Sequence, residues 1–284
     1  MEHERELSPP PPTFQQVVAA GATDRGLVRE RNEDQFVVAE MTRAMHVKTT
    51  SLAQPSMLFG NVNIRGHLFA VADGMGGHPG GQEASALAVW TIEDFLLNTL
   101  RWFFRLQGDT VLREFQLALR AADDRIFAEA ERRPELRGMG TTLTLAYAVD
   151  HVLYVVHVGD SRLYVMRAGG LYQITQDHSL VSEMVRDGLI PPESAATHPM
   201  RNVITNSVGG DKPGVRPEVH KIPLEPNDVV LLCTDGLTKM VADAEIAAIM
   251  AAEADPAAAC ARLIERANAL GGHDNVTAIV AQFS

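Results

Sequence analysis

The chain has 284 residues, of which 46% are hydrophobic, and its formal net charge is −11. This composition is typical of a globular protein with one large or two small domains. The acidic balance argues against sequence-independent nucleic-acid binding, which needs a basic surface. The start, MEHERELSPPPPTF, lacks the pattern of a secretory signal, and no apolar run reaches the length of a membrane span. The two cysteines, Cys233 and Cys260, make no disulfide framework, so we expect a cytoplasmic protein that does not bind membranes.

The predicted elements begin after a polar terminus. Residues 1–15 include four consecutive prolines, so we expect a flexible N-terminal arm. No linker divides residues 16–284, which we expect to form a single domain. Residues 41–56 interrupt the strand pattern and predict a loop between two strands.

Two helical stretches come next, at 84–100 and about 110–133, where apolar residues recur at helical spacing. Strand patterns rich in Thr, Val, Tyr and Leu follow at 141–149, 151–160 and 162–175. A buried strand is expected at 228–236, two helices at about 242–253 and 256–270, and a closing strand at 276–283. Strands come in blocks and helices in pairs, unlike the alternation of a doubly wound sheet. We therefore predict an α+β fold, a four-layer α-β-β-α sandwich of two antiparallel sheets flanked by helix pairs.

Acidic residues stand at strand ends or tight turns throughout this pattern. They occur in RERNED, VADG, HVGDSR, CTDG and GGHDN, and they are Glu33, Asp34, Asp73, Asp160, Asp235 and Asp274. Any one Asp-Gly pair is most simply a turn. As a group, however, carboxylates gathered at one end of a sandwich would repel unless cations neutralised them. Hard divalent cations prefer oxygen ligands, so the pattern predicts a site for Mg²⁺ or Mn²⁺.

The motifs R-E-R-N-E-D, A-D-G-M-G-G, G-M-G-T-T, G-D-S-R, T-D-G-L and H-D-N-V-T, in this order, resemble those of the metal-dependent serine/threonine protein phosphatases. This is the PPM family, protein phosphatase type 2C, in its bacterial form. The resemblance covers about residues 16–284 and implies a protein serine/threonine phosphatase. It also implies two Mn²⁺ or Mg²⁺ ions, with a weaker third, and phosphoprotein substrates that include a Ser/Thr protein kinase. We expect the enzyme to act as a monomer, without nucleic acid.

The resemblance assigns roles to individual residues. Asp73 looks like the carboxylate that bridges two ions, and the Gly74 carbonyl like a ligand of the second. The remaining metal positions match Asp235 and Asp274 at the first ion, Glu33 and Asp34 near the second, and Asp160 with Asp235 at the third. Arg29 matches the arginine that holds the substrate phosphate, for which a planar guanidinium is suited. Asn275 is expected to orient a water molecule.

The implied mechanism is direct attack of a metal-activated water on phosphorus, so neither cysteine serves as a nucleophile. Many eukaryotic members of the family have a histidine at the position of Met75, where it resembles a general acid. A thioether cannot transfer a proton, so a metal-bound water is the first candidate to protonate the leaving alkoxide and His78 the second. Residues 179–212 match the family's flap, in which Arg186, His198 and Arg201 are candidates to touch a phosphopeptide.

Three other functions remain open from the sequence. A catalytically inactive relative would bind phosphoproteins or sense metal, but it would be expected to lack Asp235 or Asp274. A dinucleotide-binding oxidoreductase is suggested by GMGGHPGG after a strand, although G-x-G-x-x-G fits no register there. A regulatory phosphatase acting on an anti-anti-sigma-type protein would share the chemistry and differ in its partner.

Overall fold

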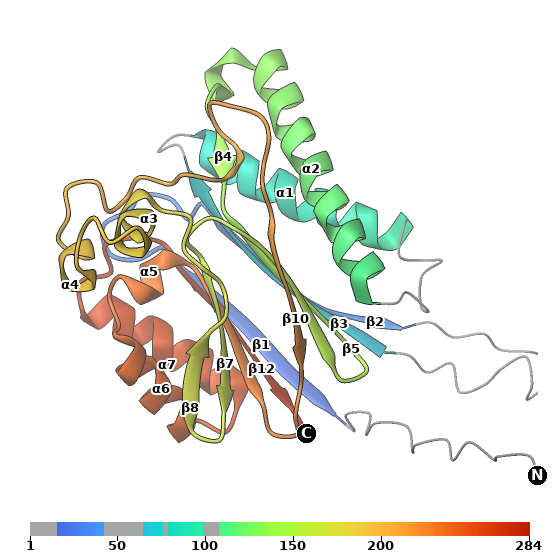
Figure 1. Cartoon of the computed structure of the whole chain (residues 1–284), viewed down its shortest axis with the longest axis vertical. Helices are drawn as coiled ribbons and strands as arrows, with labels where there is room; N and C mark the ends of the chain where they lie inside the picture. The colour runs from blue at the N-terminus through green and yellow to red at the C-terminus, as the bar shows by residue number, and fades with distance from the viewer. Residues whose placement is uncertain (1–15, 43–64, 76–78, 99–107) are drawn as a thin grey trace, which may run out of the picture.

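Figure 1 shows a computed structural model of the chain, which describes residues 16–42, 65–75, 79–98 and 108–284. Two sheets stack face to face, and every strand pairing in them is antiparallel. The five-stranded sheet has the order β1 (Val17–Asp24), β12 (Val276–Phe283), β11 (Val229–Cys233), β7 (Arg162–Arg167) and β8 (Gly170–Gln173). The seven-stranded sheet has the order β10 (Glu218–Pro223), β6 (Val152–Val158), β5 (Leu143–Val149), β3 (Arg65–Met75), β4 (Gly140–Thr141) and β9 (Val208–Gly209), and β2 (Asp34–Thr42) pairs with β3.

Helix pairs cover the two outer faces (Figure 1). The helices α1 (Pro79–Asn98) and α2 (Gly108–Arg132) pack on the seven-stranded sheet, where Phe115 and Leu119 are fully buried. The helices α6 (Asp243–Ala252) and α7 (Pro256–Ala269) pack on the five-stranded sheet. A third cluster of buried side chains, including Phe69 and Phe283, fills the space between the sheets. The predicted four-layer sandwich is therefore confirmed.

Two tight turns join neighbouring strands of the sheets. Asp150, between β5 and β6, has a positive φ of 54°, and Ala168 and Gly169, between β7 and β8, have φ values of 50° and 80°. Only the turn of Ala168 and Gly169 has positive φ at both central residues, which gives a turn whose twist matches that of the flanking strands. All five residues of β11 are buried, as expected for a strand covered on both faces.

The chain between β8 and β9 folds over one end of the sandwich. It contains α3 (Leu180–Arg186) and α4 (Pro192–Ala195). Elsewhere in the chain, the short 3-10 helix η3 (Pro134–Leu136) follows α2. Ser179 caps α3 by accepting a hydrogen bond from the Ser182 amide, and an isolated bridge pairs Ser179 with Ile204. We call residues 179–212 the flap. Beside it, the short helix α5 (Asp235–Thr238) follows β11 directly.

Two sequence predictions concern residues that are not described, the arm at 1–15 and most of the loop at 41–56, although β2 and β3 flank the latter as expected. The expectation that Asp73 stands at a strand end or a tight turn is wrong, because Asp73 lies inside β3. The strand continues to Met75, because Gly74 and Met75 pair with β4. None of the helices in the described part of the chain has the length and apolar character that crossing a bilayer requires.

Candidate active site

A cavity of about 1170 Å³ opens at the end of the sandwich that the flap covers. Its lining includes Asp73, Asp160, Asp235 and Asp274, which come from β3, the β6–β7 loop, α5 and the segment before β12. Segments far apart in the sequence thus bring their carboxylates to one place. The flap contributes Arg201 to the same cavity, so a substrate entering it would contact both the acidic floor and the flap.

Asp73 lies at the centre of this acidic group. Burial raises the pKa of Asp73 well above its ordinary value, and so do the four surrounding carboxylates, Asp34, Asp235, Asp160 and Asp274. The backbone around Asp73 is fixed by β4 and the residue after it, since the Asp73 N–H donates to Thr142 Oγ1 at 3.0 Å and its carbonyl accepts from the Thr142 amide at 2.9 Å. A centrally placed carboxylate is able to contact more than one cation.

Asp34 lies opposite Asp73 in the β2–β3 register and does not line the cavity. Its Oδ2 accepts hydrogen bonds from Thr277 Oγ1 at 2.6 Å and Thr234 Oγ1 at 2.9 Å. Burial raises the pKa of Asp34 to about 7, although the two hydroxyls act in the opposite direction. Its Oδ1 is buried without a hydrogen-bond partner.

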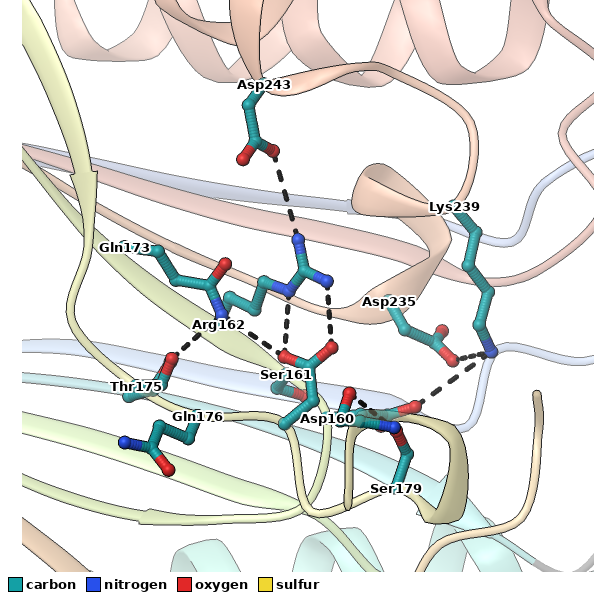
Figure 2. A network of polar contacts seen from close by, with 12 residues as sticks. Asp160, Ser161, Arg162, Gln173, Thr175, Gln176, Ser179, Asp235, Lys239 and Asp243 are labelled. Carbon is teal, nitrogen blue, oxygen red and sulfur yellow. Dashed lines mark hydrogen bonds and ion pairs between the residues drawn. The ribbon is translucent and has the colours of Figure 1, made fainter. Parts of the chain in front are cut away.

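Asp160 and Asp235 form the other half of the floor. Burial, with the nearby charge of Asp235, raises the pKa of Asp160 to about 8. Lys239 binds both groups: its Nζ hydrogen-bonds to Asp235 Oδ2 and lies 4.0 Å from Asp160 Oδ2 (Figure 2). Beside them Arg162 makes two hydrogen bonds of 2.8 Å to Asp177, which fixes the start of β7.

The glycines after Asp73 and Asp235 allow close approach of two backbones. A Cβ on Gly74 would lie 2.3 Å from the carbonyl oxygen of Gly81, and a Cβ on Gly236 would lie 1.9 Å from that of Asn275. Neither glycine has the left-handed φ of a turn, whereas Gly159, before Asp160, has φ of 109°. Of the three glycines next to a site aspartate, only Gly159 is therefore required for a left-handed backbone conformation.

Arg29 and Asp274 meet at the rim. Arg29 Nη2 donates to Asp274 Oδ2 at 2.7 Å, and the Arg29 side chain is 49% exposed. The hydrogen bond to Asp274 raises the pKa of Arg29 further, so the guanidinium stays charged. An exposed guanidinium beside the cavity is able to exchange this carboxylate for a substrate phosphate.

The Asn275 side chain holds the loop that carries Arg29. Its Nδ2 donates to the carbonyls of Arg25 at 2.9 Å and Arg31 at 2.8 Å, and its Oδ1 accepts from the Glu33 amide at 2.8 Å. Both amide hydrogens are therefore used by the loop. The expected role of Asn275 in orienting water stays a prediction, and the structure adds a loop-positioning role.

The predicted carboxylates fit hard divalent cations. Asp34 Oδ1 and Asp235 Oδ1 are buried without a hydrogen-bond partner, which is costly for a carboxylate unless a cation is supplied. The Glu33 side chain lies next to Gly81, where a Cβ would meet Glu33 Oε2 at 2.4 Å, and Glu33 also lines the cavity. Mg²⁺ and Mn²⁺ prefer oxygen ligands, and this site provides carboxylate oxygens from several segments, two of them without a hydrogen-bond partner.

A second group of potential metal ligands lies behind this site but is internally satisfied. His157, His178 and Glu218 place ligand atoms within 4.8 Å of one another. The His157 Nε2 lies 3.0 Å from the Gly159 carbonyl, so it donates, and Nδ1 accepts from Thr144 Oγ1 at 2.8 Å. Burial lowers the pKa of His157 to about 4. Both ring nitrogens of His157 are thus occupied by hydrogen bonds. One of these bonds holds the carbonyl of Gly159 in the turn before Asp160.

The structure thus brings together Arg29, Glu33, Asp73, Gly74, Asp160, Asp235, Asp274 and Asn275, and Asp34 lies directly behind them. The candidate acid His78 lies outside the described residues. Sequence reasoning missed Lys239, for which the signal was its place four residues after Asp235 in a helical turn. It also missed the pair Thr234 and Thr277, each next to or near a motif aspartate.

Cys233 and Cys260 both lie in the core of the five-stranded sheet and its helices. Both are free and buried, and burial raises the pKa of the Cys233 thiol to about 12 and that of Cys260 to about 11. A thiol with so high a pKa is a poor nucleophile.

Comparison with known proteins matches this arrangement to one family. The sequence model of protein phosphatase 2C matches residues 44–271. The serine/threonine phosphatase stp of Listeria welshimeri is 34% identical over 260 residues, which are 92% of this chain and 93% of that protein. The serine/threonine protein phosphatase PstP of Mycobacterium tuberculosis is 36% identical over 262 residues, 92% of this chain and 44% of PstP.

Solved structures agree with the sequence relatives. The PstP/Ppp structure from Mycobacterium tuberculosis superposes with a TM-score of 0.77 at 34% identity, covering 94% of this chain and 99% of that one. The PstP catalytic domain in complex with two manganese ions gives a TM-score of 0.75 at 34% identity, with 94% and 97% coverage. The chain therefore belongs to the protein phosphatase 2C family of metal-dependent serine/threonine protein phosphatases. The family expected from the sequence motifs is confirmed.

Proposed function

We propose that this chain hydrolyses phosphoserine and phosphothreonine in proteins, at the cavity between the acidic floor and the flap. The observation that carries the proposal is the convergence of carboxylates around Asp73, two of whose neighbours have a buried, unpartnered oxygen. The carboxylate set is complete, which favours an active enzyme over an inactive binding relative.

The family resemblance suggests which residues would hold two divalent ions, and the cavity lining supports the proposal. Asp73 would be the central ligand, the Gly74 carbonyl would serve one ion, and Asp235 and Asp274 would serve the other. Glu33 and Asp34 support the Gly74 side, Asp34 from behind the cavity wall. We propose Mn²⁺ or Mg²⁺, and the two manganese ions of the PstP structure support this choice. A pair of such ions, when bound, lowers the pKa of water and stabilises negative charge on a phosphoryl group.

The chain's own residues bind and orient the substrate. Arg29 leaves Asp274 and donates two hydrogen bonds to phosphoryl oxygens, which its planar fork allows. Asn275 keeps the Arg29 loop in place through its three hydrogen bonds. Met75 lines the cavity but has no proton to give, so His78 stays our proposed side-chain candidate for protonating the leaving oxygen.

Partner and cellular context are also proposals. We propose that a Ser/Thr protein kinase is among the substrates, that residues 16–284 act as one catalytic domain, and that the enzyme is a monomer. Arg186, His198 and Arg201 of the flap remain candidates for phosphopeptide contacts, and of these Arg201 lines the cavity. The buried free thiols suit a cytoplasmic location.

The test is hydrolysis of a phosphothreonine peptide by the purified protein with Mn²⁺, with EDTA, and with an Asp235→Asn variant. We expect hydrolysis that needs the metal and falls about 10²-fold in the variant, a loss typical of removing one strong electrostatic contact. Asp150→Asn, on an exposed turn, is the matched control and keeps full activity. An intact, metal-loaded protein without activity would contradict the proposal and favour phosphoprotein binding.

A further inference from the structure

Lys239 places a positive charge inside the acidic cavity. It is the C-cap residue of α5, and its Nζ hydrogen-bonds to Asp235 Oδ2 and lies 4.0 Å from Asp160 Oδ2. Figure 2 shows the lysine side chain reaching down from α5 to both carboxylates. Both carboxylates are buried, and all three residues line the cavity. One ammonium group therefore faces two acidic groups from separate elements.

The backbone fixes the lysine at this position. Its N–H donates to the Asp235 carbonyl at 2.8 Å, and the neighbouring residues Leu237 and Val241 are completely buried. The end of α5 cannot shift without exposing these side chains. An ion pair between residues i and i+4 on an exposed helix contributes little. Here the acceptors are buried and come from two elements, so the ammonium compensates two charges that would otherwise repel.

The two oxygens of Asp235 have different surroundings. Oδ2 accepts the hydrogen bond from Lys239, whereas Oδ1 is buried without a partner. Asp235 is therefore able to offer Oδ1 to a metal ion while Oδ2 stays with the lysine. The space between Asp160 and Asp235 Oδ2 already contains a cation that belongs to the chain.

We propose that Lys239 is a resident cation, which neutralises the Asp160–Asp235 pair and keeps a divalent ion out of the space between them. A divalent ion would have to displace the ammonium against its positive charge. The enzyme would then bind only two divalent ions in total. The third, which Asp160 and Asp235 would otherwise share, would be excluded. This inference rests on the proposed function for the two remaining ions.

The test counts bound Mn²⁺ per chain by titration, with the free ion followed by electron paramagnetic resonance. We expect two ions for the native protein and one additional, weaker ion for Lys239→Gln, which removes the charge and shortens the side chain by one atom. Lys239→Met, a second neutral variant, repeats the count. Lys239→Arg keeps a cation and is expected to stay at two. Lys221→Gln, on the exposed surface of β10, is the matched control and also stays at two.

Adding Asp160→Asn to Lys239→Gln is expected to remove the additional ion, which places it at this pair of carboxylates. A native protein that binds three ions would overturn the proposal, and so would folded Lys239→Gln and Lys239→Met variants that bind only two. Circular dichroism shows which variants are folded. The count needs no substrate, so it is separate from the proposed activity: a native protein that binds two ions and hydrolyses no phosphopeptide contradicts the activity alone.

Discussion

Asp73 and Asp235 are both followed by glycine and both reach the same cavity, yet their surroundings differ. Asp73 lies within β3, which continues past it, and the largest charges acting on it are four other carboxylates. Asp235 begins α5 and is paired with Lys239, which that helix itself supplies. The same dipeptide thus provides a carboxylate surrounded by like charges in β3 and a partly neutralised carboxylate at the start of α5.

The difference shows how the fold divides the charge of the site. The Asp73 side of the floor needs cations from solution, because its nearest charged neighbours are negative. The Asp235 side has a cation of its own, so it needs fewer ions.

The largest expected effect is on catalysis. Asp73→Asn should lower kcat by about 10³-fold or more, because the central ligand contacts both proposed ions. Asp235→Asn should lower kcat by only about 10²-fold, since Asp274 still serves the same ion. Steady-state hydrolysis of a phosphothreonine peptide at saturating Mn²⁺ gives both values. Equal losses in the two variants would contradict a central role for Asp73.

The second prediction concerns the stability of the metal-free protein. The pKa values of Asp34 and Asp160 are raised to about 7 and about 8 by burial, from 3.8. The folded state therefore favours their protonated forms, and this stabilisation is complete below the unfolded pKa and is lost as pH rises through the folded values. For Asp34 the contribution is on the order of 4 kcal/mol.

The measurement is the thermal unfolding midpoint in EDTA between about pH 5 and about pH 8. We expect the midpoint to fall as pH rises, the slope to be smaller in Asp34→Asn, and added Mn²⁺ to remove it because the cation favours the charged carboxylates. A midpoint that rises with pH in EDTA would contradict the prediction, because it would show that the folded protein keeps these carboxylates charged without metal.

The third prediction compares Gly236, which allows close approach of two backbones, with Gly169, which lies in a turn. Gly236→Ala should lower the free energy of unfolding by about 3 kcal/mol, because its Cβ would overlap the Asn275 carbonyl. Gly169→Ala should cost about 1 kcal/mol, since a Cβ there meets nothing within 4 Å and only the φ of 80° is strained. Urea denaturation measures both. If Gly236→Ala is as mild as Gly169→Ala, close backbone approach is not the reason for glycine at 236.

The smallest effect distinguishes the two cations of the site. Arg29 is expected to leave Asp274 during turnover, whereas Lys239 stays with Asp235. Arg29→Lys should therefore lower kcat/KM by about tenfold, because lysine lacks the planar fork that binds two phosphoryl oxygens. Arg132→Lys, exposed at the end of α2, is the control and should change nothing. An unchanged kcat/KM in Arg29→Lys would rule out a forked contact.

Most of the fold was predictable because hydrophobic periodicity reports directly on burial. The closing strand was predicted at 276–283 and is found there, and the helix pairs follow their apolar patterns. The acidic residues of the site were predictable as a group, since carboxylates at strand ends demand compensation. Their order along the chain also matched one family.

The remaining features depend on which segments meet in space. The side-chain amide of Asn275 holds a loop about 245 residues earlier in the chain, and Thr277 of the five-stranded sheet donates to Asp34 of the seven-stranded sheet. The continuation of β3 past Asp73 depends on β4, which is only two residues long. Local patterns carry none of this information, because the partners become neighbours only in the folded chain.

The most direct test is a crystal structure of the protein soaked in Mn²⁺, with anomalous diffraction recorded at the manganese edge. We predict two anomalous peaks, both in contact with Asp73, and the Lys239 ammonium between Asp160 and Asp235. A single peak, or peaks that do not contact Asp73, would contradict the account of the metal centre. A peak between Asp160 and Asp235 with the lysine displaced would contradict the division of charge.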